Sequence, residues 1–345
     1  MAENKYLKWL AHETQSNWWH DSAIPEELDE AISNGAVGLT TNPFLVRTSL
    51  FAMPGFWKPM LKDIPKSINP AQKAEEIAKV ITVYLAKKLL PIYERTQGEQ
   101  GYACAQVNPG KAGDADIMLD MARRLTKWSP NIAVKLPVTQ AGLEVLEECV
   151  AEGLTVTATA SFTVPQALAI GDRHMKGLAR AKKNNIKQGK CFAVIMVGRL
   201  DDYIRDVAHD RKASNVRESD IIQAGIAAIM RSYDIYHERK YEAILMPAGK
   251  RGAYHIKSLS GAKMVMSIAP KIAKMVMDEK GPYKEHMHEP VAKDVIARLM
   301  TIPEFVRGYE PDGMRPEEFI TYGVMQKTLA QFVEAGWGPM EGFDL

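Results

Sequence analysis

Lys135 is the residue whose setting in this sequence best fits covalent chemistry. It lies in the apolar stretch 131–137, which is typical of a buried strand and ends at a proline that cannot continue a sheet ladder. Lysine is rarely buried without a partner, and removal from water or nearby cations favours its uncharged, nucleophilic amine. Such an amine can attack a carbonyl carbon and form an imine. The strand alone leaves open a structural lysine paired with a carboxylate.

Other polar side chains stand at the ends of further strand-like stretches. They are Asp21, Asn42, Gln106, Thr159, Arg199 and Arg251. A carboxylate in such a place can move protons, and arginines bind anionic groups while disfavouring a nearby ammonium. Lys250 and Arg251 lie in a turn flanked by glycines, 248–252, which is typical of a phosphate-binding nest. A solvated loop is the alternative for this turn, and pairing with Asp201 or Asp202 is the alternative for Arg199.

Strand-like and helix-like stretches alternate along the chain, as in βα units around a parallel sheet. The predicted strands cover residues 16–21, 36–41, 102–107, 131–137, 154–160, 192–197, 243–246 and 264–268. The main predicted helices cover residues 25–32, 71–93, 114–125, 139–153 and 219–237. Residues 44–68 are rich in Pro, Phe, Met and Lys and are expected to be irregular.

This order of elements predicts an α/β fold, a (β/α)8 TIM barrel with extra helical segments. In such a barrel the carboxyl ends of the strands meet on one face, which would bring the polar residues named above together with Lys135. We expect one barrel domain over residues 1–345. It would carry a helical excursion at about 44–100 and helical C-terminal additions at about 275–345. Neither a repeat nor a linker-like stretch indicates a second domain.

Composition argues against several classes of function. A net charge of +2 favours neither nucleic acid nor an acidic partner, and the apolar runs are too short to span a membrane. The polar N-terminus lacks the apolar core of a signal peptide. Cys104, Cys149 and Cys191 sit in apolar segments, which favours reduced thiols and the cytoplasm. His286 and His288 lack a convincing third ligand, so we expect a solvated polar stretch and no metal site.

Four motifs resemble those of the transaldolase family of class I aldolases. Residues 38–43, Gly-Leu-Thr-Thr-Asn-Pro, are similar to the family's first signature, and Val-Lys-Leu-Pro at 134–137 is similar to its Schiff-base lysine signature. Thr-Ala-Ser-Phe at 159–162 resembles the next strand end, and Val-Gly-Arg at 197–199 resembles a further family motif. Arg251 matches the family's phosphate arginine. The resemblance covers most of residues 15–275.

The resemblance implies a role for each matching residue. Lys135 would form the imine, Asp21 would transfer the proton, and Thr159 would hold the catalytic water. Asn42 would bind donor hydroxyls, and Arg199 with Arg251 would hold phosphate, with Lys250 adding a further donor. The implied activity is transfer of a three-carbon dihydroxyacetone unit between sugar phosphates, in cytoplasmic carbohydrate metabolism of the pentose phosphate pathway type. Neither cofactor nor metal is implied, and a homo-oligomer is left open.

Three positions depart from the transaldolase pattern. Gln106 stands where transaldolases usually carry Glu. The fructose-6-phosphate aldolase branch carries Gln at this position. An amide can orient a water but cannot accept a proton. Val194 replaces the serine that helps to bind the donor, and Met196 stands where transaldolases favour Phe and the aldolase branch favours Tyr. These positions keep open reversible aldol cleavage with an altered donor, and a sugar-phosphate-binding protein without turnover.

Overall fold

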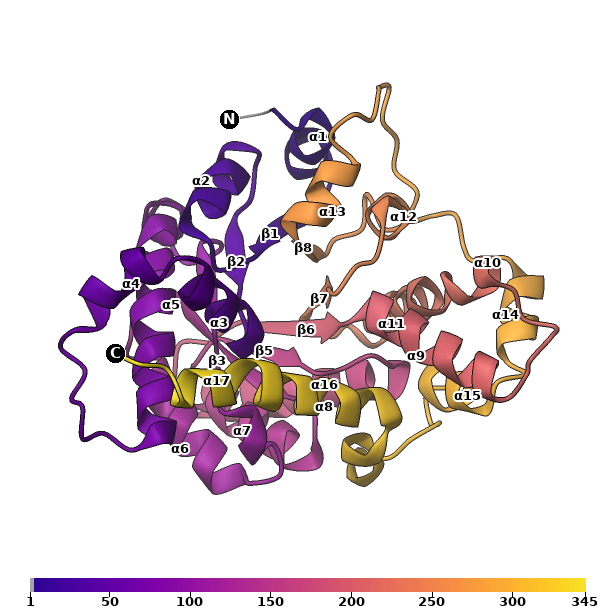
Figure 1. The fold of residues 1–345 in the computed structure, drawn as a ribbon. Helices are drawn as coiled ribbons and strands as arrows, with labels where there is room; N and C mark the ends of the chain where they lie inside the picture. Colours follow the sequence, from indigo (N-terminus) through magenta and orange to yellow (C-terminus); the bar gives the residue numbers. More distant parts are fainter. Residues whose placement is uncertain (1–2) are drawn as a thin grey trace.

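A closed barrel of parallel strands forms the centre of the protein. The computed structural model describes residues 3–345. Its strands are β1 (Asn17–Asp21), β2 (Gly38–Thr40), β3 (Tyr102–Gln106), β4 (Ile132–Pro137), β5 (Val156–Thr159), β6 (Cys191–Ile195), β7 (Ile244–Pro247) and β8 (Val265–Ile268). They pair in the order β7-β6-β5-β4-β3-β2-β1-β8, and β7 packs next to β8 at the two ends of this order (Figure 1). The predicted (β/α)8 TIM barrel is therefore confirmed.

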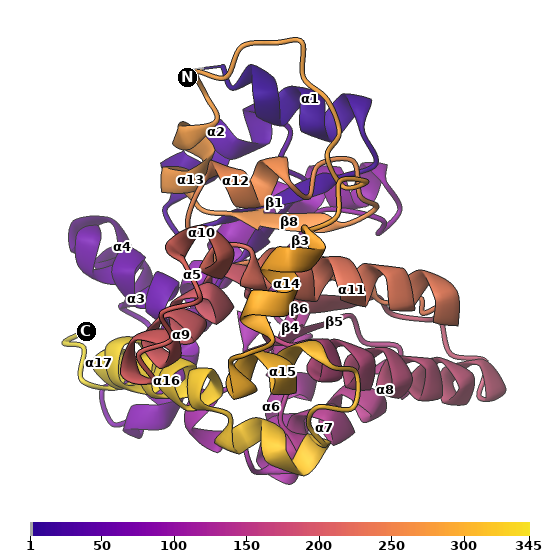
Figure 2. The same ribbon diagram turned by 90° about the vertical axis from the view of Figure 1, so that its right-hand side faces the viewer.

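Helices surround the barrel and follow most of its strands (Figure 2). In the first half they are α1 (Lys5–Glu13), α2 (Pro25–Ser33), α3 (Pro43–Ala52), α4 (Pro54–Leu61), α5 (Pro70–Arg95), η1 (Pro109–Lys111), α6 (Ala115–Leu125) and α7 (Gln140–Ala151). In the second half they are α8 (Val164–Lys183), α9 (Val197–Asp210), α10 (Glu218–Ile221), α11 (Ala224–Arg239), α12 (Ala253–Lys257), α13 (Pro270–Met275), α14 (Lys293–Leu299), α15 (Pro303–Tyr309), η2 (Pro316–Thr321), α16 (Gly323–Phe332), η3 (Val333–Trp337) and α17 (Gly338–Glu341). Within residues 3–345, we find no helix with the length and apolar character needed to cross a bilayer.

Two stretches differ from the prediction. The irregular structure expected for 44–68 is wrong over most of that range, because α3 and α4 occupy it. Pro43 and Pro54 are the first residues of these helices, a position where a missing N–H costs nothing. The sixth strand ends at Ile195 rather than Val197, and α9 begins at Val197. The sequence prediction placed no helix between the sixth strand and residue 219, where α9 lies.

An aromatic cluster fills the N-terminal end of the barrel. The ring centroids of Trp19 and Phe192 are 4.5 Å apart, and those of Tyr102 and Phe192 are 5.9 Å apart. Gly38 makes room for this cluster, since a Cβ atom there would lie 2.4 Å from the Trp19 ring. Trp18 and Trp19 are both 1% exposed, which confirms core packing rather than substrate stacking for this pair. This aromatic packing inside the barrel leaves the C-terminal ends of the strands for polar chemistry.

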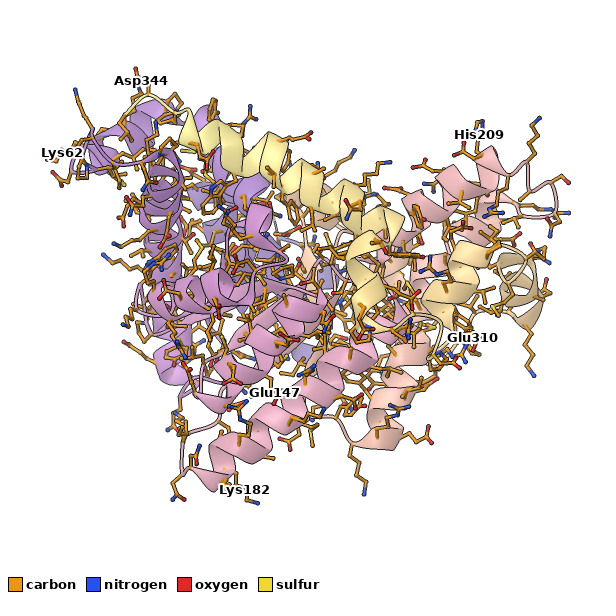
Figure 3. All side chains as sticks on the ribbon, turned by 90° about the horizontal axis from the view of Figure 1, so that it is seen from below. Lys62, Glu147, Lys182, His209, Glu310 and Asp344 are labelled. Atoms are coloured by element: carbon orange, nitrogen blue, oxygen red, sulfur yellow. The ribbon has the colours of Figure 1, made fainter. Side chains whose placement is uncertain are left out.

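The C-terminal helices lie on the side of the barrel where strands β2, β3 and β6 end. Helix α16 contacts α3, η1 and α9, the elements that directly follow those strands. Figures 1 and 2 show α16 and α17 in yellow, on the same side of the molecule as α3 and α9. In Figure 3, the labels Lys62 and Asp344 mark the region where the C-terminal end of the chain packs. The ring of Phe343 lies 5.4 Å from the ring of Phe51. The C-terminal segment thus forms part of the barrel mouth.

Candidate active site

Lys135 lies near the C-terminal end of β4, inside the barrel. Its side chain is buried, and Nζ donates a hydrogen bond of 3.1 Å to the backbone carbonyl of Thr41. Thr41 directly follows β2, so the bond reaches across the barrel mouth from β4. The partner is a neutral carbonyl, and this contact does not fit the alternative of a structural lysine paired with a carboxylate.

Gln106 and Thr159 end the two strands that flank β4. Gln106 is level with Lys135 in the β3–β4 ladder, and Thr159 is level with Pro137 in the β4–β5 ladder. Neighbours at the same level of parallel strands share a face, so Gln106 and Lys135 both point into the barrel. Gln106 Oε1 is buried and has no hydrogen-bond partner within residues 3–345. It is an acceptor directed into the site. Ala160, which follows Thr159, has a left-handed backbone with φ of 50°.

Asp21 ends β1 and is held by hydroxyl groups. Thr40, level with Asp21 on β2, donates from Oγ1 to Asp21 Oδ1 at 2.7 Å. The same Thr40 oxygen lies 2.7 Å from Ser267 Oγ on β8. The charges of Asp21 and Lys135 both act on the thiol of Cys104 in the barrel interior. Burial raises the pKa of this thiol, the charge of Lys135 lowers it, and the charge of Asp21 raises it. The predicted carboxylate and lysine therefore belong to one polar cluster at the C-terminal face.

Arg199 points to the C-terminal helix rather than to an acid. Its guanidinium donates to Gln331 Oε1 at 2.6 Å and to Thr328 Oγ1 at 3.5 Å, and it lies over the ring of Phe332. Burial, followed by the positive charge of Arg251, lowers the pKa of Arg199 to about 10, which leaves it protonated at neutral pH. The contacts do not support pairing with Asp201 or Asp202. The charge of Arg199 stays available to an anion.

Arg251 lies beside Arg199 in the loop after β7. Its Nε and Nη2 bind Asp202 Oδ2 at 2.8 and 2.7 Å, and its Nη1 donates to the Gly249 carbonyl at 2.8 Å. Its side chain is half-exposed. Gly198 allows the two arginine-bearing segments to approach, since a Cβ atom there would lie 2.4 Å from the Gly249 carbonyl. The two arginines thus come together, as expected for an anion site.

Asn42 and Lys250 each make contacts that the sequence did not indicate. Asn42 caps α3, with Oδ1 accepting from Leu45 N at 3.0 Å, which leaves its amide NH₂ for another partner. Lys250 is buried, and its Nζ donates to the carbonyls of Pro247 and Ser267. Burial lowers the pKa of Lys250 to about 7, opposed by the charge of Asp21. Its amine is directed into the barrel, while Arg251 points outward to Asp202; binding of phosphate by Lys250 stays a prediction.

Several residues of the site were not identified from the sequence. They are Thr40, Ser267, Asp201, His255, Thr328 and Gln331. Thr40 lies inside the Thr-Thr-Asn-Pro motif and Ser267 in the eighth strand, so their positions offered a signal. Thr328 and Gln331 offered none, because nothing in the sequence places α16 against Arg199.

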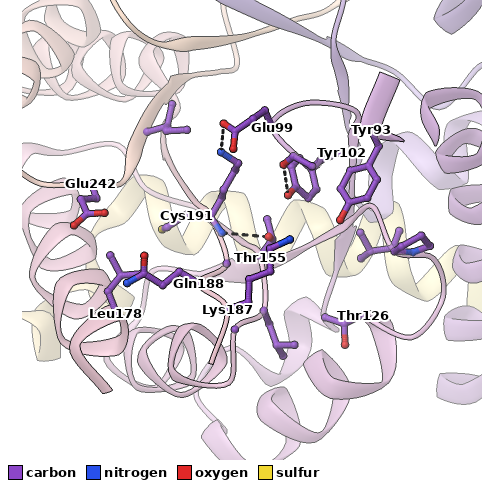
Figure 4. A pocket seen from close by; sticks show the side chains of 18 of the residues that line it. Tyr93, Glu99, Tyr102, Thr126, Thr155, Leu178, Lys187, Gln188, Cys191 and Glu242 are labelled. Carbon is purple, nitrogen blue, oxygen red and sulfur yellow. Dashed lines mark hydrogen bonds and ion pairs between the residues drawn. The ribbon is translucent and has the colours of Figure 1, made fainter. Parts of the chain in front are cut away.

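A separate cavity opens at the other end of the barrel. Its volume is about 450 Å³, and the first residues of several strands line it, among them Tyr102, Cys191 and Ile244 (Figure 4). Lys190 there pairs with Glu99 at 2.7 Å, and the Tyr102 hydroxyl donates to the Gly98 carbonyl. Their polar groups are already partnered, and none of the predicted site residues lines the cavity. The candidate active site is the C-terminal face.

The histidines of the 285–289 stretch lie outside this face. His286 Nδ1 is 3.0 Å from Glu289 Oε2. Within residues 3–345, no group of three His, Cys, Asp or Glu side chains is arranged to hold a metal ion.

The fold and the site together define a (β/α)8 barrel protein with a buried lysine among polar groups at its C-terminal face. A family model described as Transaldolase/Fructose-6-phosphate aldolase matches residues 18–318. The chain therefore belongs to the transaldolase/fructose-6-phosphate aldolase family, which confirms the resemblance of its motifs.

Individual relatives are distant. A transaldolase of Thiobacillus denitrificans is 26% identical over 243 residues, covering 68% of this chain and 65% of the relative. A transaldolase of Mycolicibacterium smegmatis is 29% identical over 257 residues, covering 69% of this chain and 66% of the relative. One from Kocuria rhizophila is 31% identical over 156 residues, covering 43% and 41%. The chain matches just under two thirds of the length of the first two relatives.

Proposed function

We propose that this protein is a transaldolase-type enzyme. It transfers a three-carbon dihydroxyacetone unit between sugar phosphates through a Schiff base on Lys135. One observation carries the proposal: the buried amine of Lys135 lies at the C-terminal face of the barrel, bonded to a neutral carbonyl and level with Gln106. An amine in this place, held by a neutral carbonyl rather than a carboxylate, is the group that can attack a ketone.

The chemistry requires a base as well as the amine. Lys135 adds to the ketone carbon of the donor, and loss of water gives an iminium. Asp21 accepts the proton of the hydroxyl on the carbon that leaves, the carbon–carbon bond breaks, and its electrons pass to the iminium to give an enamine. An aldehyde is released. The enamine then attacks the carbonyl carbon of a second aldose phosphate, and hydrolysis frees Lys135.

Three further residues bind and orient the reactants in this proposal. Thr159 and Gln106 hold a water between them and the imine. Gln106 can orient that water but cannot take its proton, so proton transfer depends more on Asp21. The amide NH₂ of Asn42, left free by the cap of α3, binds donor hydroxyls.

The phosphate of the substrate is bound by Arg199 and Arg251. Two adjacent guanidinium groups favour an anion with several oxygens, and charge-assisted hydrogen bonds of this kind are the strong ones. Arg251 exchanges its contact with Asp202 for the phosphate. Helix α9, which carries Arg199, and the loop that carries Arg251 approach closely at Gly198 and Gly249. This close approach supports the assignment.

A second candidate reaction is aldol cleavage, as in fructose-6-phosphate aldolases. It is favoured by Gln106, and by Val194 and Met196 in and after β6, where a serine and an aromatic ring are absent. Without the serine hydroxyl the donor is held less specifically. In this case the enamine is protonated, water hydrolyses the resulting iminium, and dihydroxyacetone leaves as the product while Lys135 is regenerated. A protein that binds sugar phosphates without turnover is the third and least supported candidate.

The proposed setting follows from the family and the composition. The substrates are sugar phosphates or short ketoses and aldehydes, the protein needs no cofactor, and it works in the cytoplasm without nucleic acid or membrane. We propose one barrel domain with helical additions for residues 1–345. A homo-oligomer stays open, and its test is the mass of the protein in solution.

Borohydride trapping tests the Schiff base. The protein is incubated with fructose 6-phosphate or dihydroxyacetone, reduced with borohydride, digested and mapped by mass spectrometry. We expect the reduced donor on the peptide that contains Lys135, and none in Lys135→Met. Label on another lysine, or none with either donor, would overturn the proposal.

The fate of the enamine separates transfer from cleavage. With fructose 6-phosphate alone, release of dihydroxyacetone at the rate of aldehyde formation indicates an aldolase. A rate that depends on an added aldose phosphate acceptor, with no free dihydroxyacetone, indicates a transaldolase. Tight sugar-phosphate binding without imine or exchange would favour the binding protein.

A further inference from the structure

Lys250 is a second lysine buried in the mouth of the same barrel. It is 6% exposed, as is Lys135. Its Nζ donates to the Pro247 carbonyl at 2.5 Å and to the Ser267 carbonyl at 2.8 Å. Within residues 3–345 it forms no ion pair, so two neutral carbonyls are the groups that hold this amine. A buried amine held by two carbonyls is not free to bind a ligand at the protein surface.

The two carbonyls belong to neighbouring strands that no ladder joins. Pro247 ends β7 and Ser267 lies in β8, and these strands stand at opposite ends of the pairing order. Lys250 therefore crosses the seam at which the barrel closes.

The contacts continue from Ser267 to the proposed base. Ser267 Oγ lies 2.7 Å from Thr40 Oγ1, and Thr40 Oγ1 lies 2.7 Å from Asp21 Oδ1. An ionised carboxylate only accepts, so Thr40 donates its proton to Asp21. The Thr40 oxygen then accepts from Ser267. The chain of contacts runs from Lys250 through β8 and β2 to the end of β1.

Lys250 and Asp21 also interact through their charges. Asp21 raises the pKa of Lys250 against the lowering by burial. The other titratable groups around this end of the barrel are Lys135 on β4, Arg199, Asp201 and Asp202 on α9, and Arg251 and His255 after β7. The charge of Lys250 lowers the pKa of His255. Asp21 is the acid that acts on Lys250.

We propose that Lys250 is a positioning residue for Asp21, which it fixes through Ser267 and Thr40. The proposal rests on the proposed function, because it assigns Asp21 the proton transfer. Gln106 makes this role important, since it cannot accept a proton and leaves Asp21 as the base. Lys250 neither touches the donor nor forms the imine.

Lys250→Met tests the role by removing the charge and the donors while keeping the length of the side chain. Thr40→Val removes the hydroxyl that holds Asp21, and Thr40→Ser restores it. We expect Lys250→Met to lower kcat by about tenfold to a hundredfold, as general-base catalysis weakens. Because burial lowers the pKa of Lys250 to about 7, kcat/KM of the wild type should fall as pH rises through about 7, where Lys250 loses its proton, and this step should be absent in Lys250→Met.

A double-mutant cycle separates positioning from a purely structural role. If Lys250 acts through Thr40, Lys250→Met added to Thr40→Val should lower kcat by less than twofold, whereas Thr40→Ser should retain most of the activity. Independent, additive losses would overturn the proposal. So would a Lys250→Met enzyme that melts at a lower temperature but keeps the wild-type pH profile. If Lys250→Met does not fold, Lys250→Gln keeps a hydrogen-bond donor at the seam without the charge, and the step near pH 7 should again be absent.

Trapping distinguishes the failure of this proposal from the failure of the proposed function. Borohydride should label Lys135 in the wild type and in Lys250→Met alike. Absence of label in the wild type would overturn the proposed function. Label on Lys135 with an unchanged pH profile in Lys250→Met would overturn the positioning role alone. Label on Lys250 would overturn both.

Discussion

His255 and Asp201 form a fully buried pair. It joins the loop that carries Arg251 to helix α9, which carries Arg199. Nε2 of His255 lies 3.0 Å from Oδ2 of Asp201, and neither side chain is exposed. On the other side of the ring, Nδ1 accepts a hydrogen bond of 3.1 Å from the backbone N–H of Arg251. Because Nδ1 accepts, the ring proton is on Nε2 and faces Asp201. Asp201 lies two residues after Arg199, so the pair fixes the backbone of Arg251 against the helix that carries Arg199.

Replacing His255 with Phe should loosen the Arg251 loop. The ring volume is kept, but the Arg251 N–H loses its acceptor, and an unsatisfied buried donor costs about 1–3 kcal/mol. We expect KM for a phosphorylated donor to rise by roughly tenfold, with little change for dihydroxyacetone, in steady-state assays. In an Arg251→Ala background the same substitution should not raise KM further. A rise in that background would show that His255 acts elsewhere.

Arg251→Ala tests the anion site directly. A desolvated, charge-assisted contact is worth roughly 1.5–3 kcal/mol, so use of a phosphorylated substrate should weaken by about tenfold to a hundredfold. Reaction with unphosphorylated dihydroxyacetone should hardly change. The matched control is Arg205→Ala, since Arg205 also pairs with Asp202, at 2.8 Å. Equal losses with both substrates would mean that Arg251 supports the barrel rather than the phosphate.

Gln331 extends the site to the C-terminal helix. Its Oε1 accepts from Arg199 at 2.6 Å and orients a guanidinium that forms no ion pair with a carboxylate within residues 3–345. Gln331→Ala should raise KM for phosphorylated donors by about threefold to tenfold, as expected for loss of one hydrogen bond. Lys327→Ala is the control on the same helix, because Lys327 pairs with the exposed Asp206. Matching effects in the two variants would assign the change to the helix as a whole.

The elements were predictable where a local pattern decides them. Eight short apolar strands alternating with helices defined the barrel, and Thr139 was identified as a helix N-cap, as its bond to Gly142 N shows. The prediction for residues 44–68 was wrong because it rested on their composition, whereas Pro43 and Pro54 each occupy the first position of a helix, where proline is favourable. The start of α9 at Val197 was missed because an apolar strand runs directly into an amphipathic helix.

The contacts of the site were predictable only in part. Strand ends in a parallel barrel meet on one face, so the meeting of Lys135 with Gln106 could be expected from alternation and order alone. The direction of a long side chain in a loop could not, and Lys250 turned into the barrel instead of joining Arg251. The contact of Gln331 with Arg199 joins residues far apart in the sequence, and no local pattern marks such a contact.

Acid should destabilise the protein through two buried histidines outside the proposed chemistry. Burial lowers the pKa values of His20 and His174 to about 4. Between pH 6.5 and 4 the unfolded chain binds protons that the folded chain does not, so stability falls as pH falls through this window. Each histidine should remove up to about 3 kcal/mol by pH 4. Urea unfolding of wild type and His174→Gln across this range measures the slope, which should be shallower in the variant; equal slopes would contradict a buried neutral His174.

Gln106→Glu tests whether the amide limits proton transfer. Gln106 lies level with Lys135 on the adjacent strand, and its buried Oε1 has no hydrogen-bond partner within residues 3–345. A carboxylate there could accept the proton that the amide cannot, and general-base catalysis contributes about 10²–10⁴-fold. We therefore expect Gln106→Glu to raise the rate of transfer to an aldose phosphate by tenfold or more, relative to the rate of dihydroxyacetone release. Gln106→Met, which keeps the volume and removes the polar atoms, should lower both rates. If Gln106→Glu instead slows both reactions while borohydride trapping at Lys135 also falls, the new carboxylate has paired with the Lys135 amine, and the neutral amide of Gln106 is required for imine formation.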